Sequence, residues 1–393
     1  MIERRQGTVV YKYSEFSLGG GDPLSASGSH SLKVDLSGIC IPEEIPLRRR
    51  MPLPPEKRSR RYEASFDSRT LIYDAFWKDD RIVLICPRLL NLWPVLRDGL
   101  RLNGKAVSVR RRRNLRFERL ELRARVSSEQ STSLKLDLHG RRLPVAVHED
   151  LSPLFAGLRG IVTMVKDTPH DWIVDWARWH AETQGTEALV LYDNATTTFD
   201  MTETAARLER DTGLKRIAIV SAPFPYGGPA GGRFVTPAKF LQVAMLNLAR
   251  ERFFGSARSV LSVDLDEFMK PMQERTIHEL AEDSPLGVVH FFGTWAFAEE
   301  NQGPAPQRAH RLTIPGGGVR RKAKWCAVPG RRAGRFAWAV HRPGGVFYPL
   351  TRVAAGYWHF RSTTTGWSRS PITSAQHTRH DPELAGALRR VFS

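Results

Sequence analysis

The stretch Ser262–Phe268 carries residues whose types and spacing could do chemistry. Asp264 and Asp266 are separated by one residue and follow an apolar run that is typical of a buried strand. Side chains alternate along a strand, so both acids should point the same way while Leu265 enters the core. Two carboxylates on one face repel each other, and a hard divalent cation such as Mg²⁺ or Mn²⁺ relieves that repulsion. The pattern therefore indicates either a metal site or a strand end with two solvated acids.

The composition is that of a soluble globular protein. The chain has 393 residues, of which 41% are hydrophobic and 25% charged, enough for about two or three domains. No apolar run approaches the roughly 18 residues of a membrane-spanning helix, and the N-terminus lacks a signal-peptide core. Cys40, Cys86 and Cys326 follow no zinc-binding spacing, which favours a reducing compartment. We therefore expect a cytoplasmic protein, with peripheral membrane contact left open.

The formal net charge of +18 is unusual for such a composition. It would suit nucleic acid, an anionic membrane surface or a phosphate-bearing substrate. Much of it lies in short arginine-rich runs at 48–50, 58–61 and 110–113, which usually form solvated faces. No nucleic-acid reading motif accompanies these runs, so we do not expect nucleic acid as a partner.

The first 150 residues divide into two segments. Residues 1–65 are rich in Gly, Ser, Pro and Arg, and we expect them to be flexible or loosely ordered. Residues 66–150 carry short runs of alternating apolar residues, with turn signals at Asn103-Gly104 and His139-Gly140. The runs are at 82–86, 120–126, 134–138 and 143–147. Such spacing predicts a small β-sandwich-like accessory domain.

After residue 150, apolar runs alternate with helical patterns. The predicted strands are at 161–165, 188–191, 216–220, 260–264 and 287–292. The first predicted helix has Thr168 as its N-cap, and two further helices are predicted at 202–210 and 237–254. Strand–helix–strand units imply parallel pairing, so residues 155–365 should form an open α/β sheet of the Rossmann type, followed by a C-terminal tail at 366–393. Ligands bind such sheets at the carboxyl ends of the strands, where the paired acids lie.

The order of polar motifs in this segment resembles that of the GT-A glycosyltransferases, and most closely the glycosyltransferase family 92 type. The family signature Asp-Ile-Asp-Glu-Phe appears as Asp264-Leu265-Asp266-Glu267-Phe268, and its Tyr-Asp-Asn strand end as Tyr192-Asp193-Asn194. The further matches are Lys166-Asp167, Asp175-Trp176 with His180, Gln242 with Asn247, Phe292-Gly293, residues 324–329, His341 and His359-Phe360-Arg361-Ser362. Asp167 replaces an Asn and Asp175 a Glu, which leaves the donor open. The resemblance covers about 158–365.

The resemblance implies a metal-dependent transferase that moves a hexosyl or related sugar from a nucleotide sugar to a hydroxyl of a glycan or lipid-linked acceptor. Such chemistry belongs to polysaccharide biosynthesis, and the family suggests inversion at the anomeric carbon. Mn²⁺ or Mg²⁺ would be held by Asp264, Asp266 and a late histidine, with His341 preferred to His359. The cation would neutralise charge on the diphosphate leaving group.

The resemblance also assigns nucleotide contacts and a proton acceptor. Nucleotide contacts are expected from Asp167, Asp193, Asn194, Gln242 and Lys324. A general base must deprotonate the acceptor hydroxyl, and the candidates are Glu267, Glu299 and Glu300, among which the sequence does not choose. Turn capping is the alternative role for Asp167 and Asp193, and a surface cation is the alternative for Lys324.

Two other functions stay open at the level of sequence. A sugar nucleotidyltransferase uses a similar sheet and metal, but it should carry a Gly-rich loop ending in Arg and Lys after the first strand. This chain has Lys166-Asp167-Thr168-Pro169 there. A non-enzymatic binder of anionic surfaces or nucleic acid would use the net charge and would not need Asp264 and Asp266.

Overall fold

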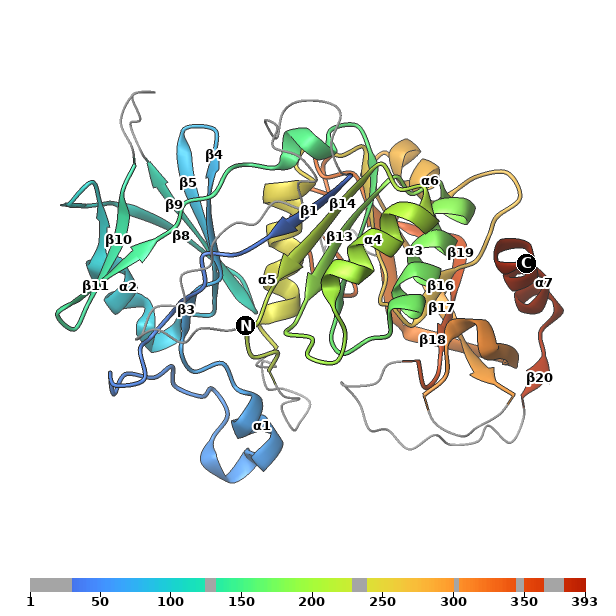
Figure 1. The fold of residues 1–393 in the computed structure, drawn as a ribbon, viewed down its shortest axis with the longest axis horizontal. Coiled ribbons are helices and arrows are strands. Elements are labelled where there is room, and N and C mark those ends of the chain that lie inside the picture. The colour runs from blue at the N-terminus through green and yellow to red at the C-terminus, as the bar shows by residue number, and fades with distance from the viewer. Residues whose placement is uncertain (1–29, 124–131, 228–238, 300–303, 344–349, 364–377) are drawn as a thin grey trace. The chain divides into compact units, whose positions relative to one another are not determined.

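The computed structural model describes residues 30–123, 132–227, 239–299, 304–343, 350–363 and 378–393, with 317–322 described by their backbone alone. Contacts divide the chain into two compact units (Figure 1). Of the described residues, 35–151 and 222–252 belong to the first unit. The second unit contains, among the described residues, those of 30–34, 152–221 and 253–393. None of the helices in the described ranges is long and apolar enough to cross a membrane.

Two four-stranded antiparallel sheets form the body of the first unit. One sheet has the order β4 (Asp74–Lys78), β5 (Arg81–Pro87), β9 (Phe117–Arg123) and β8 (Val109–Arg113). The other has the order β11 (Arg141–Val145), β10 (Leu134–Leu138), β6 (Leu100–Leu102) and β7 (Lys105–Ala106). Both sheets contribute to one apolar core, which includes Leu84, Leu120 and Leu136.

The two turns predicted from sequence connect strands of the second of these sheets. Asn103 and Gly104, between β6 and β7, have φ of 51° and 78°. His139 and Gly140, between β10 and β11, have φ of 47° and 77°. Two successive residues at positive φ make a type I′ turn, whose twist matches that of a hairpin.

Residues 30–65, within the segment expected to be loosely ordered, contain β1 (Ser31–Val34), β2 (Ile39–Cys40) and α1 (Arg60–Ser65). β2 pairs with β3 (Thr70–Ile72). Apolar residues between the arginines are buried, among them Ile41 and Leu53, and Arg49 donates from the interior to the carbonyl oxygens of Asp67 and Thr70. The composition of residues 1–65 suggested a loosely ordered segment, because a composition averages over the few residues that anchor the chain. The expectation for residues 1–29 falls outside the described part.

The second unit is built on a ten-stranded mixed sheet. Its order begins with β1, β14 (Arg216–Ser221), β13 (Ala188–Asp193), β12 (Arg159–Val165) and β15 (Ser259–Ser262), all parallel. It continues through β18 (His310–Ala327), β17 (Val288–Ala298), β19 (Arg352–Phe360) and β16 (Glu267–Met269), with β20 (Arg379–His380) beside β18. The predicted α/β class with an open sheet is confirmed.

The direction in which strands are added reverses between β12 and β15. β12, β13 and β14 follow one another outward on one side, whereas the next strand, β15, joins the opposite edge of β12. Such a reversal is the topological switch point of an open α/β sheet, where ligands bind at the carboxyl ends of the two strands. The residues that follow Val165 and Ser262 therefore lie at the expected ligand-binding edge.

Helices α3 (His170–Gln184) and α4 (Met201–Thr212) follow β12 and β13 and pack on each other. Trp176 and Trp179 of α3 are buried in the core, as their helical spacing predicts. The predicted N-cap, Thr168, is wrong. Pro169 occupies that position without a side-chain cap, and the Thr168 hydroxyl instead donates to the Lys166 carbonyl at 3.2 Å.

Two segments differ from their sequence assignments. The helix predicted at 237–254 is present as α5 (Leu241–Leu248), which continues as a π-helix over Ala249–Phe253. α5 contacts β5 and β9 and belongs to the first unit. The predicted tail contains α7 (Pro382–Phe392), which buries Leu384 and Leu388 in the core of the second unit. Asp381 caps this helix by accepting from Leu384 N–H at 3.0 Å, and Asp-Pro before a periodic apolar run was the signal for it.

The remaining α-helices of the described residues are α2 (Trp93–Gly99) in the first unit and α6 (Ile277–Asp283) in the second. α2 lies between β5 and β6 in the chain. α6 begins with a capping box in which Thr276 and Glu279 exchange side-chain and backbone hydrogen bonds.

Candidate functional site

The acidic stretch is a turn rather than a strand end. β15 stops at Ser262, and residues 264–267 turn into β16. Glu267 N–H donates to the Asp264 carbonyl at 3.0 Å, and Asp264 N–H donates to Glu267 Oε2 at 2.8 Å. Strand alternation, which the sequence argument assumed for Asp264 and Asp266, therefore does not orient them. Leu265 is 3% exposed and enters the core as expected.

Other elements hold this turn by its carbonyl oxygens. The three hydrogen bonds are Trp176 Nε1–H to Asp264 at 3.0 Å, Gln307 Nε2–H to Leu265 at 3.1 Å and Phe360 N–H to Asp266 at 2.8 Å. These donors come from α3, from the residues before β18 and from β19. The turn is thus fixed before any ligand arrives, which lowers the entropy cost of binding.

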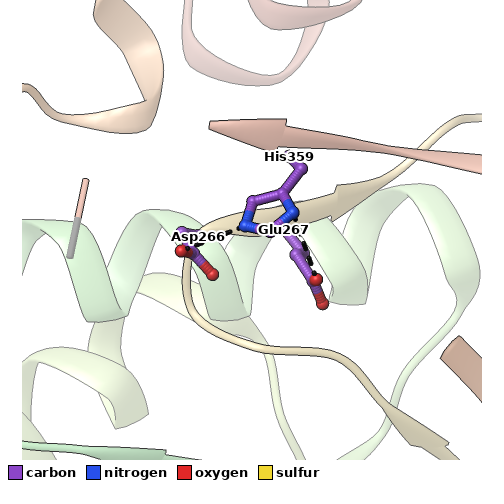
Figure 2. A group of neighbouring side chains, drawn as sticks. All are labelled: Asp266, Glu267 and His359. Carbon is purple, nitrogen blue, oxygen red and sulfur yellow. Dashed lines mark hydrogen bonds and ion pairs between the residues drawn. The ribbon is translucent and has the colours of Figure 1, made fainter. Parts of the chain in front are cut away.

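Asp266, Glu267 and His359 bring one donor atom each to within 4.8 Å of one another. Figure 2 shows the imidazole ring of His359 between the two carboxylates. Its Nε2 lies 3.3 Å from Asp266 Oδ2, and its Nδ1 lies 3.7 Å from Glu267 Oε1. The antiparallel pairing of β16 with β19 sets Glu267 opposite His359, so strand register brings the acids and the histidine together.

Among the residues that the structure describes, two polar atoms of this cluster are buried without a hydrogen-bond partner, Glu267 Oε1 and His359 Nδ1. Buried polar atoms are almost always paired, because leaving them unpaired costs free energy. Two carboxylates and one imidazole are donors that divalent cations accept. The residues present therefore fit a divalent cation, with Asp266, Glu267 and His359 as its protein donors.

Lys324 supplies a buried positive charge beside the same turn. Its Nζ lies 2.5 Å from Asp264 Oδ2 and 2.9 Å from Glu267 Oε2, and its side chain is 1% exposed. It comes from β18, the antiparallel neighbour of β15. Sequence assigned Asp264 to the metal and Lys324 to phosphate, and in the structure the two form an ion pair.

Burial and charge oppose each other in this group. Burial raises the pKa of Glu267 to about 7, against the lowering effect of Lys324. Burial lowers the pKa of Lys324, but Asp264 and Glu267 outweigh it and raise that pKa above its ordinary value. The pKa of His359 is lowered by burial and raised more strongly by Asp266 and Glu267, so the net shift is upward. Three acidic side chains face two basic ones, which leaves an excess of negative charge when Glu267 is ionised.

Aromatic side chains flank the cluster. The Trp295 ring stacks on His359 with centroids 4.2 Å apart, and the Arg361 guanidinium lies 4.6 Å from the Trp295 centroid. Parallel pairing of β17 with β19 sets Trp295 beside His359. Tyr357 is buried, and burial together with Glu267 raises its pKa. Sequence reasoning missed Trp295 and Tyr357, and the two-residue spacing of Tyr357 from His359 on a strand was the signal that could have found the latter.

The acids expected to bind a nucleoside serve as turn caps. Asp193 Oδ1 accepts Thr196 N–H at 3.0 Å, and Asp167 Oδ1 accepts Thr197 N–H at 2.8 Å. The bond from Thr197 is the largest reason why the pKa of Asp167 is lowered. Asn194 is buried with 4% exposure. Asp167 follows β12, whereas Asp193 is the last residue of β13 and Asn194 follows it, so all three lie at the carboxyl edge of the sheet, in the position that sequence expected.

Gln242 and Asn247 lie on α5, in the first unit. Gln242 Oε1 accepts the Tyr226 hydroxyl at 2.9 Å, and Asn247 Nδ2 donates to the Val243 carbonyl at 2.7 Å. The acidic turn belongs to the second unit.

The other candidates fall in different places. His341, the preferred histidine, has Nδ1 3.1 Å from the Ala323 carbonyl, and within the described ranges the histidine that converges with the acids is His359. Glu299 is exposed after β17, and Glu300 lies outside the described residues. Asp175 is buried and paired with Arg308, and burial raises its pKa.

No family model and no curated protein matches this chain. Solved structures are similar to parts of it. Core-mannan synthase A from Aspergillus fumigatus, in a Mn/GDP form, has a TM-score of 0.24 and 10% identity over 37% of this chain and 44% of that one. TarS 1-349 from S. aureus has a TM-score of 0.27 and 12% identity over 53% and 59%. GalNAc-T7 with UDP, GalNAc and Mn²⁺ has a TM-score of 0.26 and 9% identity over 55% and 46%.

The chain spans between 44% and 59% of the length of these three structures. Overlap at TM-scores this low does not define the family of this chain.

Proposed function

We propose that this protein is a metal-dependent glycosyltransferase that moves a hexosyl or related sugar from a nucleotide sugar to a hydroxyl of a glycan or lipid-linked acceptor, with inversion. One observation carries the proposal: the acidic turn 264–267 meets His359 and Lys324 at the carboxyl end of β15, beside the switch point of the sheet. The order of sequence motifs that resembles the GT-A enzymes supports it independently.

Asp266, Glu267 and His359 would hold Mn²⁺ or Mg²⁺. When bound, such a cation supplies Lewis-acid stabilisation of the diphosphate leaving group. Asp264 is the proposed further donor, because its side chain is 42% exposed and its carboxylate can exchange Lys324 for a cation. Lys324 remains an ammonium group, since its pKa is raised, and it is the proposed partner for a phosphate oxygen.

Glu267 is fully buried, so we assign it to the cation and to the ordering of the turn rather than to the acceptor proton. A bulky glycan hydroxyl needs a base that it can reach. Glu299, exposed after β17, and Glu300 remain the proposed bases.

The proposal places the nucleoside at the loops after β12 and β13. Asp193 uses Oδ1 to cap its turn, and we assign its Oδ2 to a ribose hydroxyl or a ring N–H of the base. Asp167 and Asn194 are the proposed neighbours of the same group. In this proposal the second unit is catalytic and the first is accessory. The proposed compartment is a reducing one such as the cytoplasm, with which the three free cysteines agree.

A panel of nucleotide sugars tests the proposal. One donor should raise the melting temperature of the full chain only when Mn²⁺ is present, and it should be hydrolysed slowly in the absence of acceptor. A chelator should abolish both effects. Stabilisation by no donor, or equal stabilisation with and without metal, would reject the assignment.

A further inference from the structure

β8 carries four consecutive arginines and is the edge strand of its sheet. Side chains alternate along a strand, so Arg110 and Arg112 lie on one face and Arg111 on the other. Arg111 is half-buried, pairs with Glu118 and lies 4.3 Å from the Trp93 ring centroid. Arg110 and Arg112 have side chains 62% and 55% exposed.

Strand register adds arginines from β9 and β5 to the face of Arg110 and Arg112. Arg119 pairs across from Arg112, and Arg123 of β9 pairs across from Arg81 of β5. Arg119 and Arg123 are four residues apart on one strand, so they share a face. We call this set the arginine face: Arg81, Arg110, Arg112, Arg119 and Arg123.

A single glutamate lies at the base of the arginine face. Glu121 has a side chain only 6% exposed, and Arg81, Arg110 and Arg112 each place a nitrogen 3.6 Å from it. Arg119 bonds to it as well. Shared contact with one buried carboxylate holds the stems of these side chains in place.

The arginine face carries more positive charge than its acidic partners neutralise. In the part of the chain that the structure describes, those partners are Asp80, Glu121 and Glu251. Glu251 also pairs with Arg250, which adds a further positive charge. Arg119 and Arg250 are largely buried, with side chains 16% exposed. Arg81, Arg110 and Arg112 are the exposed members, with side chains 42%, 62% and 55% exposed, so an anionic partner is favoured there by charge complementarity.

The apolar neighbour of this face identifies the class of partner. The exposed large apolar side chains of the described residues are Leu115, Phe336 and Leu350. Leu115, 76% exposed, lies in the turn that joins β8 to β9, directly beyond the arginine run. Single-stranded nucleic acid would need exposed aromatic rings for base stacking, which this hairpin does not offer. A lipid surface uses cations for its phosphates and an aliphatic tip for its acyl boundary.

We propose that the arginine face, together with Leu115, docks on the surface of an anionic lipid bilayer. Guanidinium groups donate to phosphate oxygens in pairs, which suits lipid headgroups. The inference goes beyond the proposed transferase and does not depend on the acidic turn.

Vesicle flotation of the full chain tests the docking surface. The chain should bind phosphatidylcholine vesicles that contain about a third phosphatidylserine, and not phosphatidylcholine alone. Arg110→Gln with Arg112→Gln should weaken binding about fivefold for each arginine removed. Leu115→Ser should weaken binding to vesicles while leaving binding to dextran sulfate unchanged.

The matched control is Arg141→Gln with Arg142→Gln, which removes the same charge from exposed positions of the other sheet. It should bind as wild type does. Equal loss in both glutamine pairs would show that bulk charge acts and would overturn the proposal, as would binding to dextran sulfate without binding to vesicles. Arg110→Lys with Arg112→Lys keeps the charge but not the paired donation, so it should bind vesicles more weakly than wild type and more strongly than the glutamine pair. Vesicle binding as weak as that of the glutamine pair would also overturn the proposal.

Discussion

The ammonium group of Lys324 lies 2.5 Å from Asp264 Oδ2, inside the cluster that also gathers donors for a cation. Lys324, from β18, thus places a positive charge of the chain itself against the acidic turn. This arrangement separates the two acids of the sequence motif: Asp264 faces the lysine, whereas Asp266 faces His359.

Removing Lys324 should destabilise the protein. Lys324→Met leaves the buried Glu267 carboxylate without its cation, which costs about 3–5 kcal/mol of unfolding free energy for a broken buried pair. Mn²⁺ should restore part of the loss, so it should raise the melting temperature of the variant more than that of wild type. Thermal melts with and without Mn²⁺ measure this.

The control for that variant is Lys215→Met, at a side chain 65% exposed that pairs with Glu187. It should change stability by less than about 1 kcal/mol. A Lys324 variant as stable as this control would contradict the buried pair.

His359 and His341 should differ in their effect on metal binding. His359→Ala removes one of three converging donors, so Mn²⁺ affinity should fall strongly. His341→Ala should leave it unchanged, because His341 Nδ1 contacts the Ala323 carbonyl. Titration calorimetry with Mn²⁺ measures both, and the reverse ranking would support the preference first taken from sequence.

Trp295 should act on the cluster through His359. Its ring covers the imidazole at 4.2 Å, so Trp295→Leu should free the ring to rotate and weaken Mn²⁺ binding about tenfold or more. Trp295→Phe keeps an aromatic face and should retain most of the affinity. If Leu and Phe weaken binding equally while both variants fold, stacking does not position His359.

Sequence could predict the parallel part of the sheet because apolar strands and intervening helices are local signals. Ile161 and Leu189, for example, pair in adjacent strands as expected. It could not show that β15 stops at Ser262, because a turn formed by Asp264 and Glu267 depends on one side chain bonding to a backbone N–H three residues away.

Sequence named His359 only as the second choice after His341 and missed Trp295, for a different reason. His359 meets Glu267 only through the pairing of β16 with β19, and Trp295 meets His359 only through β17. Long-range register leaves no trace in local spacing. The placement of α5 with the first unit is equally non-local, since the strands that it contacts, β5 and β9, come much earlier in the chain.

Buried histidines should make the protein sensitive to mild acid. His180 is fully buried, with Nδ1–H donating to the Trp176 carbonyl at 2.8 Å and Nε2 accepting Met269 N–H at 3.3 Å, so only the neutral ring fits. Burial lowers its pKa from 6.5 to about 3, and burial lowers that of His278 to about 3 as well. Between about pH 6.5 and pH 3 the unfolded chain binds protons on these histidines that the folded chain does not. The neutral histidines therefore contribute their whole share of the unfolding free energy above pH 6.5, and that share falls as pH drops towards 3.

Urea unfolding from pH 7 downward measures this slope, which is about 1.4 kcal/mol per pH unit for each such histidine. His180→Phe removes one proton from the number taken up on unfolding, so it should lower the slope of unfolding free energy against pH by the share of one histidine, whatever it does to absolute stability. The matched control, His30→Gln, changes an exposed histidine and should leave the slope as it is. An unchanged slope in His180→Phe would mean that His180 is not held neutral.

The two acids of the motif should separate in function. Asp266→Asn removes a charge that faces His359 but keeps the backbone carbonyl that accepts Phe360 N–H, so the turn should stay folded. Stabilisation by Mn²⁺ should disappear, and transfer or donor hydrolysis should fall by about two orders of magnitude or more, as for loss of a group that stabilises developing charge. Asp264→Asn should reduce Mn²⁺ affinity less, because Asp264 lies outside the three converging donors.

Melting temperature without metal and turnover with Mn²⁺ must be measured together. Wild-type turnover in Asp266→Asn, or inactivity only because the variant unfolds, would remove the metal site from this turn and with it the centre of the proposed transferase.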